Sequence, residues 1–257
     1  MNEEAMDIIN RMRAVAISRE YGSGGGELAS RLAGRLGWQL IDHDIVERVA
    51  SELGTSLEEA EAHDESSGGI ISELLASLQN LYPAYPPAAP PEAFLSTEEY
   101  GLTVDKIVRA AAVRGHIVIV GRASQVILAD RRDVLHVRII APFEQRVAYV
   151  MQREGLARHA AEARIHHKDL ERARYLEREY HHQPDEAHLY DLVLNTSLLD
   201  LENSVDILGF TLQQKATGLA KPTGEPGPAS GLSRYPAVPA GFPSLARLAP
   251  APGRRFC

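Results

Sequence analysis

Five short apolar runs mark the chain, and helical patterns lie between them. Each run is nearly continuous in aliphatic and β-branched residues, which is typical of strands buried on both faces of a parallel sheet. The runs are Ala14–Ser18, Trp38–Ile41, Ile117–Val120, Val134–Ile140 and Leu192–Leu194. Strands that alternate with helices predict an α/β fold built on one parallel sheet.

A long gap separates the second and third apolar runs. Helical periodicity is present near Ile45–Leu53 and Ile70–Leu81, and again over Val104–Val113. Between them, Tyr82–Phe94 reads YPAYPPAAPPEAF, and its prolines are incompatible with a regular helix or a central strand. We therefore predict an inserted helical subdomain, residues 45–113, in place of a simple crossover.

A second insertion lies between the fourth and fifth runs. After Gly155, the segment Arg158–Tyr180 has the pattern of one long charged helix or a helix pair. A charge run of this kind is usually a solvated helix face. Cations nevertheless crowd this region of an otherwise acidic protein: Arg146, Arg153, Arg158, Arg164, Lys168, Arg172, Arg174 and Arg178. We therefore predict a mobile lid, residues 153–182, that closes over phosphate groups.

The composition changes near both ends of the chain. From Lys221 onward the sequence is rich in Pro, Gly, Ala and Ser and has no period, which predicts disorder. The expected organisation is an N-terminal extension (1–13), one main domain (14–212) and a disordered tail (213–257).

Charge and cysteine content exclude several classes of function. The 257-residue chain has a formal net charge of −8, which argues against a general nucleic-acid binder but leaves room for a local basic cleft. Its single cysteine, Cys257, can form neither a disulfide framework nor a cysteine-based metal site within one chain.

The start, MNEEAMDIINRMRA, is too acidic for a signal peptide, and no apolar run approaches the length of a membrane span. We expect a cytoplasmic protein with neither a nucleic-acid nor a membrane partner. The sequence leaves the oligomeric state open.

The most informative stretch is a glycine loop between the first strand and a helix. Four glycines, Gly22, Gly24, Gly25 and Gly26, precede an apolar helical face that ends at Gly37. Strand, glycine loop and helix in this order direct backbone N–H groups and a helix N-terminus at a phosphate. A Walker A loop also has a lysine before its Ser or Thr, and this segment has none.

Three interpretations of this loop are open. A dinucleotide fingerprint would use Gly22 and Gly24, but Glu27 occupies the place of its third glycine, although Asp42 stands where a ribose-binding acid would be. A glycine-rich turn without a ligand is the plainest alternative, and it must account for the backbone entropy that glycines cost. The third interpretation is the phosphate cradle of a nucleotide kinase.

The wider pattern resembles the cytidylate kinase-like proteins, a branch of the P-loop nucleoside monophosphate kinases. The resemblance runs from about Ala14 to Leu208. It is carried by AISREYGSGGGELA, WQLIDHDIVERVA, HIVIVGRASQVIL, DVLHVRIIAPFEQRVAYVMQREGL, DLERARYL and LYDLVLNTSLLDLENSVDIL. The resemblance implies a five-stranded parallel sheet of order 2-3-1-4-5 flanked by helices. It also implies two helical insertions, one that binds the acceptor and one that forms a lid over ATP.

The resemblance assigns the glycine loop to the phosphates of ATP. Gly25 falls where the family of P-loop kinases has its lysine, and Glu27 falls where a hydroxyl residue belongs. Arg19 is the only cation close to the loop in sequence. Ser18 and Ser23 offer hydroxyls near a magnesium ion, although local turn roles fit them better. The expected ATP-binding residues are Arg19, Gly22, Ser23, Gly24, Gly25 and Gly26.

The acceptor site is assigned in the same way. Asp42 matches the acid of the acceptor site, and Arg48 and Arg122 match arginines that hold the monophosphate. Asp42 and Asp44 have a plain alternative role as N-caps of the following helix. The acid expected after Arg122 is Ala123 here, which places cytidine specificity in doubt.

In the lid, Arg164 and Arg172 resemble the arginines that stabilise the transferring phosphoryl group, with Asp169 as their orienting acid. A salt bridge between Asp169 and Arg172, three residues apart on a helix, explains that pair equally well. The expected catalytic residues are Arg122, Arg164 and Arg172, and no metal site within the protein is expected.

The sequence thus predicts a kinase that transfers the γ-phosphoryl group from ATP, taken with Mg²⁺, to a nucleoside monophosphate. Its alternative is a nucleotide-binding regulator that kept the fold and lost phosphoryl transfer. The absent lysine and Ala123 favour the regulator, whereas the lid arginines favour the enzyme.

Overall fold

The structure is a computed structural model that describes residues 3–52, 70–81 and 97–219. Its centre is a parallel sheet of five strands in the order β2-β3-β1-β4-β5. The strands are β1 (Ala14–Arg19), β2 (Gln39–Ile41), β3 (Ile117–Val120), β4 (Val134–Ile140) and β5 (Leu192–Asn195). Each apolar run in the sequence forms one strand. The order of these strands in the sheet confirms the predicted fold class and strand order.

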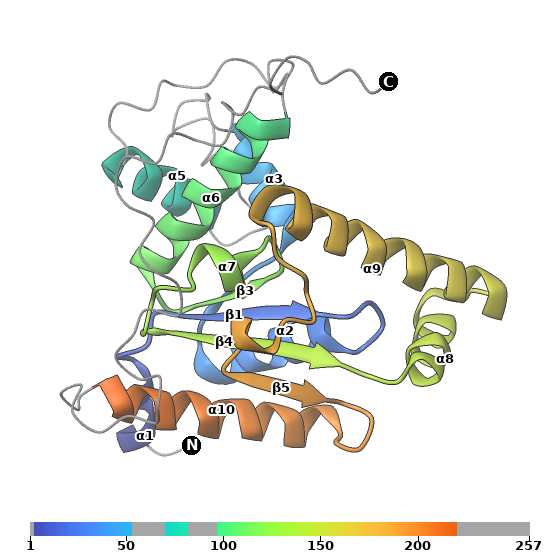
Figure 1. Cartoon of the computed structure of the whole chain (residues 1–257). Helices are drawn as coiled ribbons and strands as arrows, with labels where there is room; N and C mark the ends of the chain where they lie inside the picture. The colour runs from blue at the N-terminus through green and yellow to red at the C-terminus, as the bar shows by residue number, and fades with distance from the viewer. Residues whose placement is uncertain (1–2, 53–69, 82–96, 220–257) are drawn as a thin grey trace, which may run out of the picture.

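Helices cover both faces of the sheet (Figure 1). The elements that follow the strands are α2 (Gly25–Leu36), α3 (His43–Glu52), α5 (Ile70–Leu81), α6 (Thr97–Arg114), α7 (Ser124–Ile127), α8 (Phe143–Glu154), α9 (Arg158–Tyr180) and α10 (Leu201–Leu219). A short helix, α1 (Glu3–Ile9), precedes β1.

Alternation of side chains along β1 divides the core into two layers. Ala14 and Ala16 face a cluster formed with α3, α5, α6 and α7. Val15 and Ile17 face a second cluster formed with α1, α2 and α10. Because successive strand residues point to opposite faces, one short apolar run holds both helical layers together.

Segments on either side of the main domain pack on its core. The N-terminal extension packs on the domain, since Ile9 and Met12 are fully buried in the second cluster. The domain boundary predicted at residue 212 falls inside α10. There Ala216 is fully buried, and Lys215 binds the carboxylate of Asp191. Hydrophobic contact with the core therefore extends the helix past the predicted boundary.

The inserted segments position the site. The helices predicted at Ile70–Leu81 and Arg158–Tyr180 are present with these bounds. The proline-rich stretch Tyr82–Phe94 and most of the predicted tail lie outside the described residues. Helices α8 and α9 form a small core of their own from Val147, Val150, Ala161 and Ile165, and Tyr21 of the glycine loop packs against it. The long helix α9 runs from α8 back toward α3, so it spans the region beyond the strand ends (Figure 1).

Candidate functional site

The glycine loop connects the last residue of β1 to the first turn of α2. Gly22 and Gly24 have φ values of +81° and +76°, which L side chains rarely adopt. Gly24 is the N-cap of α2, and no side chain caps the helix there. The first amides of α2 therefore face outward, the arrangement that favours an anion.

The loop is packed tightly against helix α8. A Cβ atom on Gly22 would lie 2.9 Å from Val150 Cγ2 and 3.0 Å from the carbonyl oxygen of Arg146, both on α8. The hydroxyl of Ser23 donates to the carbonyl oxygens of Glu20, at 2.9 Å, and Ile139, at 3.3 Å. Ser23 thus shapes the turn with its hydroxyl, and its carbonyl oxygen accepts a hydrogen bond from the hydroxyl of Thr196 at 2.9 Å.

Arg19 is the cation nearest to this loop. Its side-chain stem lies against Gly25, and its guanidinium reaches Gly121, the residue after β3. Burial, together with the positive charges of Arg172 and Arg122, lowers the pKa of Arg19 to about 9, against the opposing effects of Asp42 and Asp169. The ends of β1 and β3 and helix α9 therefore bring three arginines into one electrostatic cluster, which we call the arginine cluster: Arg19, Arg122 and Arg172.

Arg122 lies two residues after the end of β3. Its backbone is left-handed, with φ +55°, and its side chain is 14% exposed. The guanidinium contacts Glu47 Oε1 at 3.1 Å and His43 Nε2 at 3.3 Å, both on α3. Burial lowers the pKa of Arg122, and nearby Tyr175 and Asp42 partly oppose that effect. In this structure the guanidinium of Arg122 is therefore already in contact with a carboxylate.

Asp42 lies at the carboxyl end of β2 and is the N-cap of α3. Its Oδ1 accepts hydrogen bonds from the backbone N–H groups of Asp44, at 3.1 Å, and Ile45, at 3.2 Å. Of the two acids expected at this helix start, Asp42 makes the cap, while Asp44 lies in the first turn. The charge of Asp42 also raises the pKa of Arg19 and Arg122, so capping and a role in the site are compatible. Arg48 lies one turn further along α3 and is half-buried.

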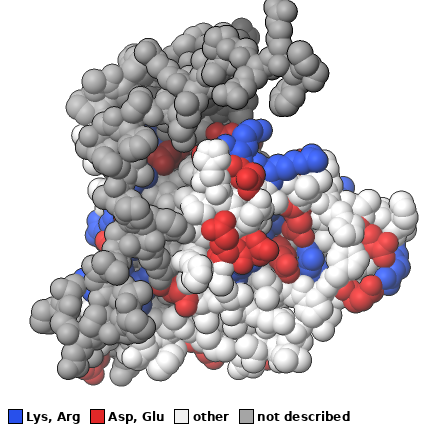
Figure 2. All heavy atoms as spheres, viewed as in Figure 1, with Lys and Arg blue, Asp and Glu red and all other residues white. Residues whose placement is uncertain are grey.

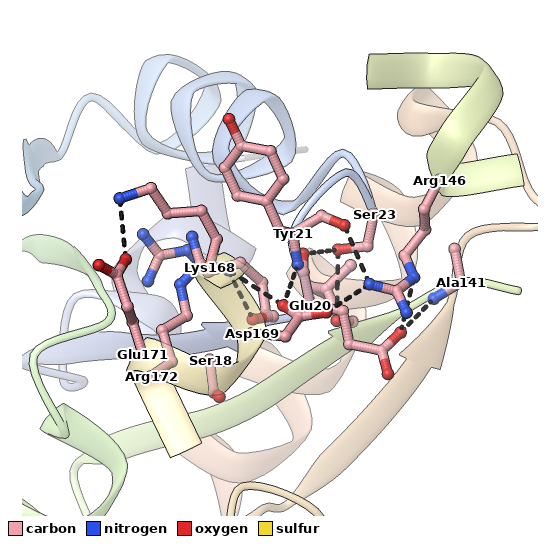
Figure 3. A network of polar contacts seen from close by, with 12 residues as sticks. Ser18, Glu20, Tyr21, Ser23, Ala141, Arg146, Lys168, Asp169, Glu171 and Arg172 are labelled. Carbon is pink, nitrogen blue, oxygen red and sulfur yellow. Dashed lines mark hydrogen bonds and ion pairs between the residues drawn. The ribbon is translucent and has the colours of Figure 1, made fainter. Parts of the chain in front are cut away.

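The lid is fastened to the glycine loop through Asp169 (Figure 3). Asp169 Oδ1 accepts the backbone N–H of Tyr21 at 2.7 Å, and Oδ2 accepts Arg146 Nη1 at 2.5 Å. Arg146 also donates to the carbonyl oxygen of Tyr21 at 3.1 Å. Arg172 lies over the Tyr21 ring and is 3.6 Å from Asp169. Asp169 therefore pairs with Arg172 as expected, and it also holds the loop.

Arg164 occupies a different position from Arg172. It pairs with Glu154, whose other oxygen accepts the hydroxyl of Tyr21 at 2.6 Å. Its side chain is 48% exposed. Arg164 thus reaches the loop through Glu154 and Tyr21, whereas Arg172 contacts the loop backbone directly at Arg19 O, 3.4 Å away.

Sequence reasoning did not anticipate the roles of Tyr21, Arg146, Glu154 and Glu47. Arg146 is buried although it lies in a charge-rich segment, and its partners come from the loop and from α9. The one available signal was the cation itself, on the helix that directly follows β4.

Acidic side chains are prominent on the face that carries the site (Figure 2). Within the described residues, no three His, Cys, Asp or Glu side chains are grouped so that they could hold a metal ion. No helix of the described residues is both long and apolar enough to cross a membrane.

Several known proteins are similar to this chain. The model of the cytidylate kinase-like family matches residues 14–198. The cytidylate kinase of Ignicoccus hospitalis is 26% identical over 199 residues, which cover 77% of this chain and 97% of that protein. The cytidylate kinase of Methanopyrus kandleri is 30% identical over 115 residues, which cover 42% of this chain and 60% of that protein. A crystal structure of a protein from Eubacterium ventriosum shares the fold, with a TM-score of 0.57 and 19% identity over 78% of this chain and 98% of that one.

Proposed function

The chain belongs to the cytidylate kinase-like family, and from that premise we propose that it transfers the γ-phosphoryl group of ATP to a nucleoside monophosphate. The observation that carries the proposal is the arginine cluster. Arg19, Arg122 and Arg172 come from three separate segments and meet at the carboxyl ends of the strands, beside the glycine loop. Open α/β sheets bind their ligands at this edge.

The reaction suits a site of this composition. A phosphate oxygen of the acceptor attacks the γ-phosphorus, the bond to the β–γ bridging oxygen breaks, and ADP leaves. Catalysis of this transfer consists mainly of positioning and of stabilising negative charge, so no covalent nucleophile is required. Fixed guanidinium groups supply both requirements.

The proposed roles follow the position of each residue. The amides of Gly24, Gly25 and Gly26 hold the phosphates of ATP, and Arg122 with Arg48 holds the acceptor phosphate. Arg172 stabilises the transferring group from the lid. Arg164 acts one contact further away, through Glu154. Mg²⁺ enters as part of the Mg-ATP substrate, and we assign it no ligand from the protein.

A nucleotide-binding regulator is the second candidate, and specific contacts favour it. The loop has no lysine, and Glu27 of its first helical turn is an acid. Glu47 accepts a hydrogen bond from Arg122, and Asp169 accepts one from the backbone N–H of Tyr21. Both carboxylates compete with phosphate for donors of the site, which would permit binding while slowing transfer.

ADP formation from Mg-ATP distinguishes the two candidates. CMP, dCMP, UMP, AMP and GMP are offered separately, with Arg122→Ala as the test variant. Arg132→Ala is the matched control, because Arg132 is exposed and precedes β4, at the amino ends of the strands. Turnover with one acceptor, lost in Arg122→Ala and kept in Arg132→Ala, supports the kinase. Binding of Mg-ATP in calorimetry without any turnover supports the regulator.

A further inference from the structure

The place of the missing lysine is already filled. The resemblance to P-loop kinases places their lysine at the position of Gly25. A Cβ atom at Gly25 would lie 2.8 Å from Arg19 Cβ and 3.2 Å from Arg19 Cγ. These atoms form the base of the side chain, which cannot move aside without moving β1. A lysine at position 25 is therefore incompatible with an arginine at position 19.

The other end of the same side chain lies against a second glycine. Gly121 has a φ of +79°, and a Cβ atom there would overlap Arg19 Nη1, the tip of the arginine. The Arg19 side chain thus extends from the first turn of α2, where ATP phosphates would bind, to the end of β3, next to Arg122. One guanidinium lies between the donor side and the acceptor side of the site.

The charge of Arg19 is poorly compensated. Its nearest charged neighbours include two guanidinium groups, those of Arg172 and Arg122. Within the described part of the chain, no carboxylate forms an ion pair with Arg19; Asp42 and Asp169 act on it from beyond contact distance. Arg122 contacts Glu47 and Arg172 contacts Asp169, so within the described residues Arg19 is the member of the arginine cluster without a carboxylate at ion-pair distance. A buried guanidinium beside two further cations favours an anion.

We propose that Arg19 performs the task of the P-loop lysine by contacting the transferring phosphoryl group between donor and acceptor, and that Gly25 is a glycine because a Cβ atom there would overlap the base of the Arg19 side chain. The proposal rests on the proposed kinase function. A guanidinium remains charged at neutral pH and can bind two phosphate oxygens at once, so it can follow the phosphoryl group during transfer.

The exchange of two residues tests the proposal. The variants are Arg19→Met, Gly25→Lys and the double variant Arg19→Gly/Gly25→Lys, with Gly34→Ala as the matched control on α2. Gly34 is exposed, and nothing would lie within 4 Å of its new Cβ atom. For each protein, kcat and KM for Mg-ATP, the calorimetric Kd and the unfolding midpoint are measured.

Arg19→Met should lower kcat about 100-fold, the typical effect of removing one preorganised donor from a developing charge. Gly25→Lys should lose both stability and activity because of the clash with Arg19. The double variant should recover activity at least about tenfold over either single change. Gly34→Ala should match the wild type in kcat and Kd.

Two results would overturn the proposal. In the first, the kcat and Kd of Arg19→Met are within threefold of the wild-type values. In the second, the double variant folds but is no more active than Gly25→Lys.

If the wild type binds Mg-ATP without turnover, the kinase function fails, and Kd alone decides the role of Arg19. A tenfold loss of affinity in Arg19→Met would then support phosphate contact, and unchanged affinity would refute it. A wild type that neither turns over nor binds Mg-ATP would refute both proposals.

Discussion

Asp169 is expected to hold the lid to the glycine loop, and its removal should be costly. Its two oxygens accept the Tyr21 N–H at 2.7 Å and Arg146 Nη1 at 2.5 Å. A hydrogen bond to a charged group contributes about 1.5–3 kcal/mol, and the 31% exposure of Asp169 reduces the sum of the two. Arg146 is only 10% exposed and would lose its shortest ion pair, keeping its hydrogen bond to the carbonyl oxygen of Tyr21 and the longer contact of 3.6 Å to Glu20. We therefore expect Asp169→Ala to lower the free energy of unfolding by about 2–3 kcal/mol.

Urea denaturation measures this change. An m value equal to that of the wild type serves as the check on two-state behaviour. Asp169→Asn should lose about half as much, because its amide oxygen can still accept the Tyr21 N–H. Glu171→Ala is the matched control. Glu171 lies on the same helix, and its partners, His167 and Lys168, are exposed, so we expect a change of at most about 0.5 kcal/mol. Hydrogen exchange at the Tyr21 amide should accelerate in Asp169→Ala alone. Equal stability losses in Asp169→Ala and Glu171→Ala would refute the reasoning.

Three further predictions concern the loop and its surroundings. Gly22→Ala should lower the free energy of unfolding by at least about 2 kcal/mol, because a left-handed backbone and contact with Val150 both oppose a Cβ atom; an unchanged urea midpoint would contradict this. Gly34→Ala should raise that free energy by about 0.5–1 kcal/mol, since the site is exposed, helical and open; thermal unfolding would show a loss instead if the position were crowded. The hydrogen bond from Tyr21 lowers the pKa of Glu154 below its ordinary value, and that from Arg164 adds to the effect. The stability contributed by Glu154 is therefore present above the ordinary pKa and is lost as the pH falls through the lower folded value. Stability measured from about pH 5 to pH 3 should fall less steeply in Glu154→Gln than in the wild type, and identical slopes would exclude this contribution.

Much of the fold could be predicted from the sequence, because burial on both faces leaves an unambiguous pattern. The run Ile117–Val120 is a strand with those bounds, and Arg158–Tyr180 is one helix with those bounds. Local rules sufficed for these elements, since an apolar run and a helical period depend on neighbouring residues alone. The boundary at residue 212 failed, because the contacts of Lys215 and Ala216 with the core are not visible in local composition.

The site depended on contacts between distant segments. The sequence indicated a glycine loop, a set of cations and the absence of a lysine, and the resemblance supplied the expected roles. Only the tertiary structure decided that Arg19 fills the space beside Gly25, and that Asp169 binds the amide of Tyr21, 148 positions earlier. It also separated Arg172, which meets the loop, from Arg164, which pairs with Glu154. Periodicity specifies which face of an element is apolar, whereas the partner of a charged side chain is set by the packing of whole elements. For that reason the sequence by itself determined the fold and indicated the glycine loop, and the tertiary structure decided which groups each arginine contacts.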